Sequence, residues 1–281
     1  MIAIASGKGG VGKSNIAVNL CAAFAQRGLR AILLDGDAGL ANSDVLCGLR
    51  PRRRPSEDLI GDVAADIALY DAPGGFRLAP GAAGTTGEIT VSEQRCRDLV
   101  DRLGGSGADV LVIDCGAGLG RGVRSFISCA DEAVVVTTPE PTALADAYAL
   151  IKRCRRTPTH GVNRPPSLQL VVNQCTDETD ARRASERIDT VARRFLGGGV
   201  ALAGWIPNDP TVAEAVRAQR PFFVARPRCD ASRAVRRLAR ALAPAAREDV
   251  RRPLGWGWRR LFRLGGVGGR NRRARCESIL K

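Results

Sequence analysis

The stretch Ser6–Asn15, SGKGGVGKSN, follows the apolar segment MIAIA at residues 1–5 and precedes a segment with helical periodicity. Its core, GKGGVGKS at residues 7–14, matches the pattern G-x-x-x-x-G-K-[S/T] in the strand–loop–helix context that this pattern requires. Glycines let backbone N–H groups turn inward around phosphate oxygens, and the N-terminus of the following helix adds positive charge. The stretch therefore predicts a phosphate-binding loop.

Two side chains of this loop suit phosphate chemistry directly. The Lys13 ammonium can reach the β- and γ-phosphates, and the Ser14 hydroxyl can bind Mg²⁺. A second lysine, Lys8, lies in the same loop, although the chain contains only four lysines among 43 basic residues. An arginine would serve equally well as a solvated charge, so lysine at position 8 indicates a specific role. The residues expected to bind nucleotide here are Gly7, Gly9, Gly10, Val11, Gly12, Lys13, Ser14 and Asn15.

Short apolar runs alternate with helical patterns over residues 1–245, which predicts one α/β domain with a doubly wound, mostly parallel sheet of the P-loop NTPase type. The run ADVLVIDC at 108–115 has apolar residues on both faces of the expected strand, as strands buried on both faces require. We expect strands at 1–5, 30–35, 74–80, 108–115, 132–138, 167–173 and 199–207. We expect helices at 14–26, 42–48, 93–103, 141–154, 177–195, 211–219 and 230–242.

Acidic residues follow two of these strands at the edge that carries the glycine loop. Asp35 and Asp37 end the segment RAILLDGD, and Asp114 lies near the end of VLVIDC. A carboxylate at this edge can hold Mg²⁺ through water or orient the water that attacks a γ-phosphate. Each of them could instead only cap the next turn, and for Asp35 the two interpretations are evenly balanced.

The segment KGGVGKS at 8–14 resembles the deviant Walker A loop of the MinD/ParA family of ATPases, and the resemblance covers about residues 1–225. It implies a MinD-like fold, ATP and Mg²⁺ as cofactors, and an ATP-joined homodimer in which Lys8 reaches the partner's nucleotide. It also implies that Lys13 acts on the phosphates, that Asp37 positions the hydrolytic water, and that Ser14, Asp37 and Asp114 serve the metal.

Within this family the chain looks most like the flagellar number regulators FlhG/FleN. DGDAGLANSDVLCGL at 35–49 stands where those proteins typically read DADLGLANVDVLLGL, and TTPEPTA at 137–143 matches their pattern. The resemblance implies that Glu140 meets the partner's nucleotide, and that Asn173, Pro207 and Asp209 hold the adenine base. Turn chemistry at strand ends could also explain the last three.

Residues 246–281 form a basic tail rich in Gly, Arg and Trp. From 251 to 281 the tail has nine arginines, one lysine and one glutamate, so it carries most of the net charge of +14. If 254–264 is helical, Trp258, Leu261 and Phe262 share one face and arginines the other, which is typical of a helix that lies on a membrane surface. Binding to nucleic acid or packing on the body are the alternatives.

Together with the basic tail, the resemblance implies an ATP-hydrolysing switch that controls flagellar number or placement, or cell-pole or division-site positioning, through membrane association. The expected location is cytoplasmic, at the inner face of the membrane, with a FlhF-like GTPase or a transcriptional regulator as possible partners. The alternative is a ParA-like ATPase that binds nucleoid DNA non-specifically. Nine cysteines without Cys-x-x-Cys spacing disfavour an iron–sulfur carrier, and two tyrosines disfavour a tyrosine kinase.

Overall fold

The computed structural model of the chain describes residues 1–37, 41–52, 67–81, 93–156 and 165–243. Its strands form one eight-stranded sheet in the order β3-β4-β2-β5-β1-β6-β7-β8. Neighbouring strands are parallel except for β3 and β4, so the predicted doubly wound, mostly parallel sheet is confirmed. The strands are β1 (Ile2–Ser6), β2 (Ala31–Gly36), β3 (Tyr70–Asp71), β4 (Arg77–Ala79), β5 (Val110–Ala117), β6 (Glu132–Thr137), β7 (Ser167–Cys175) and β8 (Ala201–Pro207).

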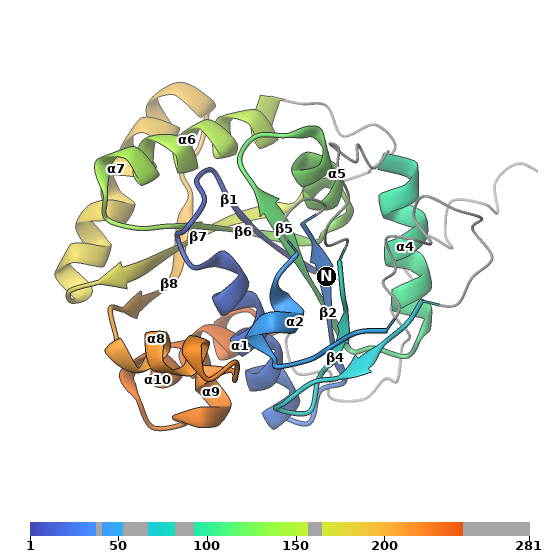
Figure 1. Ribbon diagram of the computed structural model, residues 1–281. Coiled ribbons are helices and arrows are strands. Elements are labelled where there is room, and N and C mark those ends of the chain that lie inside the picture. The colour runs from blue at the N-terminus through green and yellow to red at the C-terminus, as the bar shows by residue number, and fades with distance from the viewer. Residues whose placement is uncertain (38–40, 53–66, 82–92, 157–164, 244–281) are drawn as a thin grey trace, which may run out of the picture.

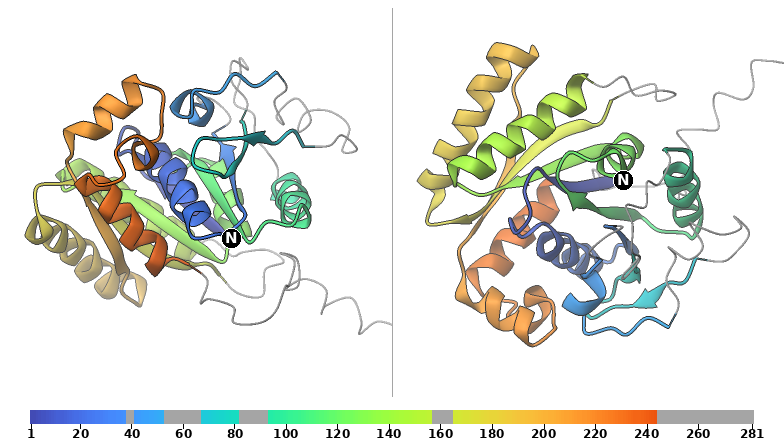
Figure 2. Two further views of the ribbon diagram at one scale, coloured as in Figure 1. Left: turned by 90° about the horizontal axis from the view of Figure 1, so that it is seen from below. Right: turned by 45° about the horizontal axis from the view of Figure 1, so that its top comes forward.

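Helices cover both faces of the sheet (Figure 1 and Figure 2). One face packs against α4, α5, α6 and α7, and the other against α1, α8, α9 and α10, each with its own hydrophobic cluster. The helices are α1 (Lys13–Gln26), α2 (Ser43–Leu46), α4 (Glu93–Gly105), α5 (Arg121–Cys129), α6 (Pro141–Arg156), α7 (Glu178–Leu196), α8 (Pro210–Arg217), α9 (Phe222–Ala225) and α10 (Asp230–Ala241).

The glycine loop leaves the sheet at its centre. Strand β1 is buried along its whole length between β5 and β6, because both of its faces are covered by helices. The chain turns to opposite sides after these strands, with α1 on one face and α5 and α6 on the other. Ligands of doubly wound sheets bind at such a change of direction, beyond the carboxyl ends of the strands.

Helix α1 is buried nearly all round, with every residue from Ile16 to Phe24 inaccessible to solvent or nearly so. The polar side chain of Asn19 is fully buried because both of its ends are bonded: Nδ2 donates to the Asn15 carbonyl at 2.7 Å, and Oδ1 accepts from the Phe223 amide at 2.8 Å. Near the end of α1, an Arg27 nitrogen donates to the Ala239 carbonyl of α10 at 2.8 Å. These bonds fasten α9 and α10 to the helix that begins at the glycine loop.

Three elements have no counterpart among the predicted ones. Helix α5 places Val123, Phe126 and Ile127 in the core. Its start is not recognisable in the sequence because glycines at 120 and 122 are typical of a loop. Strand β3 and helix α9 are two and four residues long, too short to show a period. The tail at 246–281 and its expected helix at 254–264 lie outside the described residues. Within the described part of the chain, no helix has the length and apolar character needed to cross a membrane.

Candidate nucleotide-binding site

The glycine loop between β1 and α1 is held by close backbone contacts on two sides. Gly12 has a left-handed φ of 88°, and a Cβ atom there would collide with the Asn173 side chain. Gly7 lies against α6, where a Cβ atom would collide with the carbonyl group of Asp146. Only glycine fits these two positions without displacing a neighbour. The tip of the loop is exposed, so its backbone faces solvent.

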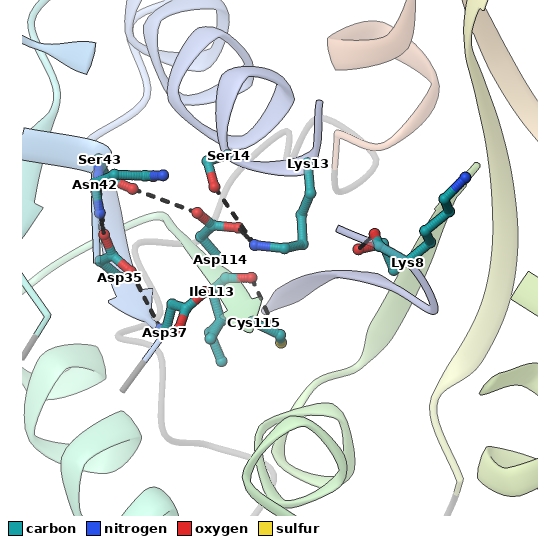
Figure 3. A network of polar contacts seen from close by, with 11 residues as sticks. Lys8, Lys13, Ser14, Asp35, Asp37, Asn42, Ser43, Ile113, Asp114 and Cys115 are labelled. Carbon is teal, nitrogen blue, oxygen red and sulfur yellow. Dashed lines mark hydrogen bonds and ion pairs between the residues drawn. The ribbon is translucent and has the colours of Figure 1, made fainter. Parts of the chain in front are cut away.

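Lys13 lies beneath this loop and forms a buried ion pair with Asp114 of β5. The Lys13 Nζ atom is 2.6 Å from Asp114 Oδ1, and the two side chains are only 7% and 1% exposed (Figure 3). The Ser14 hydroxyl lies 3.4 Å from the same ammonium and also hydrogen-bonds the Asp114 carboxyl. Burial alone would lower the pKa of Lys13, but its contacts with Asp114 raise it, so the ammonium stays charged. A buried cation is thus ready beside the helix N-terminus.

Asp35 anchors the segment that follows β2. Its register partner on β5 is Asp114, so the two carboxylates lie side by side at the edge of the sheet. Asp35 Oδ2 accepts the amides of Asn42 and Ser43 at 3.1 and 3.0 Å, and Oδ1 accepts the amide of Asp37 at 3.2 Å. Asp35 therefore has the structural capping role, which sequence patterns left undecided.

Asp37 lies at the same edge, immediately beyond β2. The position that a Cβ atom would take on Gly116 of β5 is 3.6 Å from an Asp37 carboxylate oxygen. Figure 3 shows Asp37 next to Asp35 and near Ile113 and Asp114 of β5. The structure thus brings together the three side chains expected to serve a metal, those of Ser14, Asp37 and Asp114.

The donor set at this edge fits Mg²⁺ bound together with phosphate. Among the described residues, no group of three or more His, Cys, Asp or Glu side chains is arranged to hold a metal. Ser14, Asp37 and Asp114 offer hard oxygen donors, which Mg²⁺ prefers, and Mg²⁺ commonly keeps phosphate and water among its ligands. An all-protein cage is therefore not required here.

The burial of Asp35 predicts a pH-dependent stability in EDTA without nucleotide. Burial and the neighbouring Asp114 raise the pKa of Asp35 to about 7. The unfolded chain releases this proton near pH ~4. Between these values only the folded chain holds it, so the free energy of unfolding should fall by up to about 1.4 kcal/mol per pH unit and level off above pH ~7.

Urea denaturation between pH ~5 and ~8 measures this slope. Asp35→Asn should reduce the slope, whereas Asp71→Asn, at an exposed position on β3, should leave it unchanged. A wild-type slope in the Asp35 variant would contradict the assignment.

Lys8 points away from the Lys13–Asp114 pair (Figure 3). Its Nζ atom lies 3.0 Å from Glu140 Oε2 and 3.0 Å from Thr142 Oγ1, at the start of α6. The Lys8 and Glu140 side chains are 39% and 66% exposed. The two lysines of the loop therefore have different environments, one buried against the protomer's own carboxylates and one at the surface.

The residues expected to hold adenine have structural partners. Asn173 is buried, and its Nδ2 atom donates to the Val11 carbonyl at 2.8 Å, which supports the glycine loop from the end of β7. Asp209 caps α8 through the Thr211 amide and accepts the Ala231 amide of α10. Burial opposes the charged form, yet these hydrogen bonds lower the pKa of Asp209 to about 2. Base binding by Asn173, Pro207 and Asp209 stays a prediction.

Two residues at this site are absent from the sequence-based set. The Thr142 hydroxyl accepts a hydrogen bond from Lys8, which also binds Glu140. The Ser43 hydroxyl lies next to Asp114. Thr142 stands two positions after Glu140 in TTPEPTA, which was the available signal. Ser43 lies six positions after Asp37. Its contact with Asp114 could be predicted only if β2 and β5 were known to be neighbouring strands.

Comparison with protein families gives one match over most of the chain. Residues 2–222 match the model described as the CobQ/CobB/MinD/ParA nucleotide binding domain. The chain is 39% identical to the antiactivator FleN of Pseudomonas aeruginosa over 241 residues, which cover 85% of this chain and 84% of FleN. It is 34% identical to the flagellum site-determining protein YlxH of Helicobacter pylori, covering 78% and 73% of the two chains.

Among solved structures, the fold is similar to the septum site-determining protein MinD of Pyrococcus horikoshii OT3 complexed with Mg-ADP. The TM-score is 0.70 at 25% identity, over 85% of this chain and 93% of that one.

Proposed function

The chain belongs to the CobQ/CobB/MinD/ParA nucleotide-binding family, and from this premise we propose that it is an ATP-gated switch that controls flagellar number or placement. Its nucleotide-binding domain is of the MinD/ParA ATPase type. The observation that carries the proposal is that the two lysines of the loop lie in different environments. Lys13 is buried in an ion pair with Asp114, whereas Lys8 lies at the surface in an ion pair with Glu140. In the proposed switch, Lys13 serves the protomer's own nucleotide and Lys8 serves a partner's.

Each residue of the buried cluster has a role in this proposal. Backbone amides of the glycine loop and the N-terminus of α1 bind the phosphates, and Lys13 exchanges Asp114 for phosphate oxygens. Ser14 and Asp114 would hold Mg²⁺, which would supply positive charge against the charge that develops on the phosphates during hydrolysis. Asp37 orients the attacking water. Asn173 keeps the loop in place and contacts the base together with the segment from Pro207 to Asp209.

The surface lysine supports nucleotide-dependent pairing of two copies. Lys8 and Glu140 are 3.0 Å apart on one protomer, so both would meet the same partner nucleotide in a symmetric pair. Their bond is exposed, and exposed ion pairs contribute at most about 1 kcal/mol. Lys8 can therefore leave Glu140 for a triphosphate at little cost.

The relatives support the flagellar assignment. YlxH is named a flagellum site-determining protein and FleN an antiactivator, and both are at least 34% identical to this chain. We infer that the ATP-bound pair is the form recognised by a partner, either a transcriptional regulator or a FlhF-like GTPase. Septum placement, as in the name of MinD, is the neighbouring role on the same fold.

Membrane attachment in this proposal depends on the tail at 246–281. Each arginine near an anionic surface contributes about 1 kcal/mol, and Trp258, Leu261 and Phe262 add apolar area. A single short helix binds weakly, but two tails on one pair bind more strongly through avidity, by a factor of 10² to 10⁴ as an order of magnitude. ATP would thus control attachment to the inner face of the membrane by controlling pairing.

Flotation with anionic liposomes tests this switch. With a non-hydrolysable ATP analogue and Mg²⁺, the full-length chain should float at least about tenfold more than with ADP, because pairing doubles the number of tails. A chain ending at Val250 should not float with either nucleotide. Replacing Trp258 and Phe262 by alanine should reduce flotation while keeping every arginine.

Two outcomes would contradict the membrane role. Equal flotation with ADP and with the analogue would contradict the claim that ATP controls membrane attachment. Salt-sensitive binding to DNA by the chain ending at Val250, with no flotation of the full chain, would favour the DNA-partitioning ATPase instead.

A further inference from the structure

Ser43, the first residue of α2, lies between the two carboxylates that end β2 and β5. Its backbone amide donates to Asp35 Oδ2 at 3.0 Å, and its hydroxyl donates to Asp114 Oδ2 at 3.4 Å (Figure 3). The same hydroxyl is also within reach of the Asp35 carboxyl, although its one hydrogen can be donated to only one of the two acids at a time. The side chain is fully buried, at 0% exposure. One short side chain therefore bridges two buried acids.

The two oxygens of Asp114 face different partners. Oδ1 accepts from the Lys13 ammonium at 2.6 Å, whereas Oδ2 faces the Ser43 hydroxyl. Ser14 donates to the same carboxyl from the start of α1. If Lys13 leaves for a phosphate, Asp114 loses its strongest bond, and Ser14 must serve the metal. Ser43 is then the side chain that still fixes the plane of the Asp114 carboxylate.

The hydroxyl is not needed to hold α2 in place. The Asp35 carboxyl already accepts the backbone amides of Asp37, Asn42 and Ser43, and none of these bonds uses the Ser43 side chain. Burying a hydroxyl costs free energy unless it is hydrogen-bonded, and an apolar side chain of similar size would avoid that cost. A buried serine at this point therefore indicates a role toward the carboxylates.

We propose that Ser43 is a positioning residue for the Mg²⁺ site, because its hydroxyl holds Asp114 in the orientation that serves the metal. The inference rests on the proposed nucleotide-binding function and adds a residue to it. Hydrogen bonds that a neighbouring side chain makes to a metal ligand orient that ligand, and their loss typically lowers metal affinity 10- to 100-fold as an order of magnitude. Because the bond in the structure is long, we expect an effect near the lower limit.

A magnesium titration of Ser43→Ala tests the proposal. Binding of a fluorescent ATP analogue to the full-length protein is measured first in EDTA and then at increasing free Mg²⁺. The variant should bind the analogue in EDTA with wild-type affinity, and its half-saturating Mg²⁺ concentration should rise about tenfold. The matched control is Ser185→Ala, which removes a buried serine hydroxyl from α7, a helix that packs against β7 and β8.

The outcomes separate the inference from the proposed function. If Ser43→Ala and wild type need the same Mg²⁺ concentration, the inference is wrong even though the nucleotide site stands. An equal increase in the half-saturating Mg²⁺ concentration of Ser43→Ala and Ser185→Ala would also overturn the inference. The effect would then come from a general loss of stability and not from the Asp114 carboxylate. Failure of the wild-type chain to bind the analogue would instead contradict the proposed function itself.

Discussion

Replacing Lys13 by glutamine is expected to reduce ATP hydrolysis by two to three orders of magnitude, roughly 10²- to 10³-fold. Lys13 is the buried cation of the site, and no arginine among the described residues forms an ion pair with Asp114 in its place. The substitution also leaves the Asp114 carboxyl buried without a positive partner. Loss of one member of a buried pair costs about 3–5 kcal/mol of unfolding free energy when the other stays charged.

Asp114 can lower that cost by taking up a proton. Burial raises the pKa of its carboxyl, and the Lys13 ammonium opposes this effect. Without Lys13 the pKa should rise further, so the destabilisation should be smaller at pH ~6 than at pH ~8. Steady-state hydrolysis with Mg²⁺ measures the first effect, and urea denaturation at two pH values measures the second.

Lys152→Gln is the matched control for Lys13→Gln. Lys152 lies on the exposed side of α6, so its loss should change neither hydrolysis nor stability appreciably. Hydrolysis by Lys13→Gln within a factor of about 3 of wild type would show that phosphate is bound elsewhere.

Replacing Lys8 by alanine is expected to abolish pairing while sparing nucleotide binding by the single protomer. Among the described residues, the Lys8 side chain hydrogen-bonds the exposed Glu140 and Thr142, so its loss should change the unfolding free energy by less than about 1 kcal/mol. Without the ammonium, a triphosphate at the interface of two copies lacks the charge that neutralises it from the partner's side. Hydrolysis should then fall about 100-fold if pairing completes the site.

Light scattering with a non-hydrolysable ATP analogue and Mg²⁺ measures the pairing. The wild-type chain and Lys152→Ala should double in mass, whereas Lys8→Ala should remain monomeric and still bind the analogue. A wild-type chain that stays monomeric at saturation would refute the switch. Normal pairing and turnover in Lys8→Ala would reduce the site to an ordinary nucleotide pocket.

Much of the fold could be predicted because its patterns are local. Strand β1, the glycine loop and α1 were placed within one residue, since an apolar run, a glycine pattern and a helical period follow one another there. Helix α5 was missed because Gly120 and Gly122 disguised its start. The order of the strands was not readable, because parallel strands are joined through helices and their neighbours are chosen by packing.

The site residues that lie within one sequence motif could be predicted. The contacts between residues that are far apart in the sequence could not. Lys13 and Ser14 follow from the loop pattern alone. The contact of Lys8 with Glu140 joins residues 132 positions apart and arises because β1 lies beside β6. The helix-capping bonds of Asp209 reach α10, 22 positions further along the chain, which no pattern near the strand end reports.

The bonds from α1 to α9 and α10 have a geometric consequence for anchoring. Asn19 and Arg27 fasten the last described helices to the helix that starts at the phosphate loop, so the position of α10 is fixed relative to that loop. In the proposed symmetric pair, the two α10 helices would therefore lie at a separation set by the fold. Any surface that contacts both copies would meet them at that one spacing, and a target of matching width would be preferred.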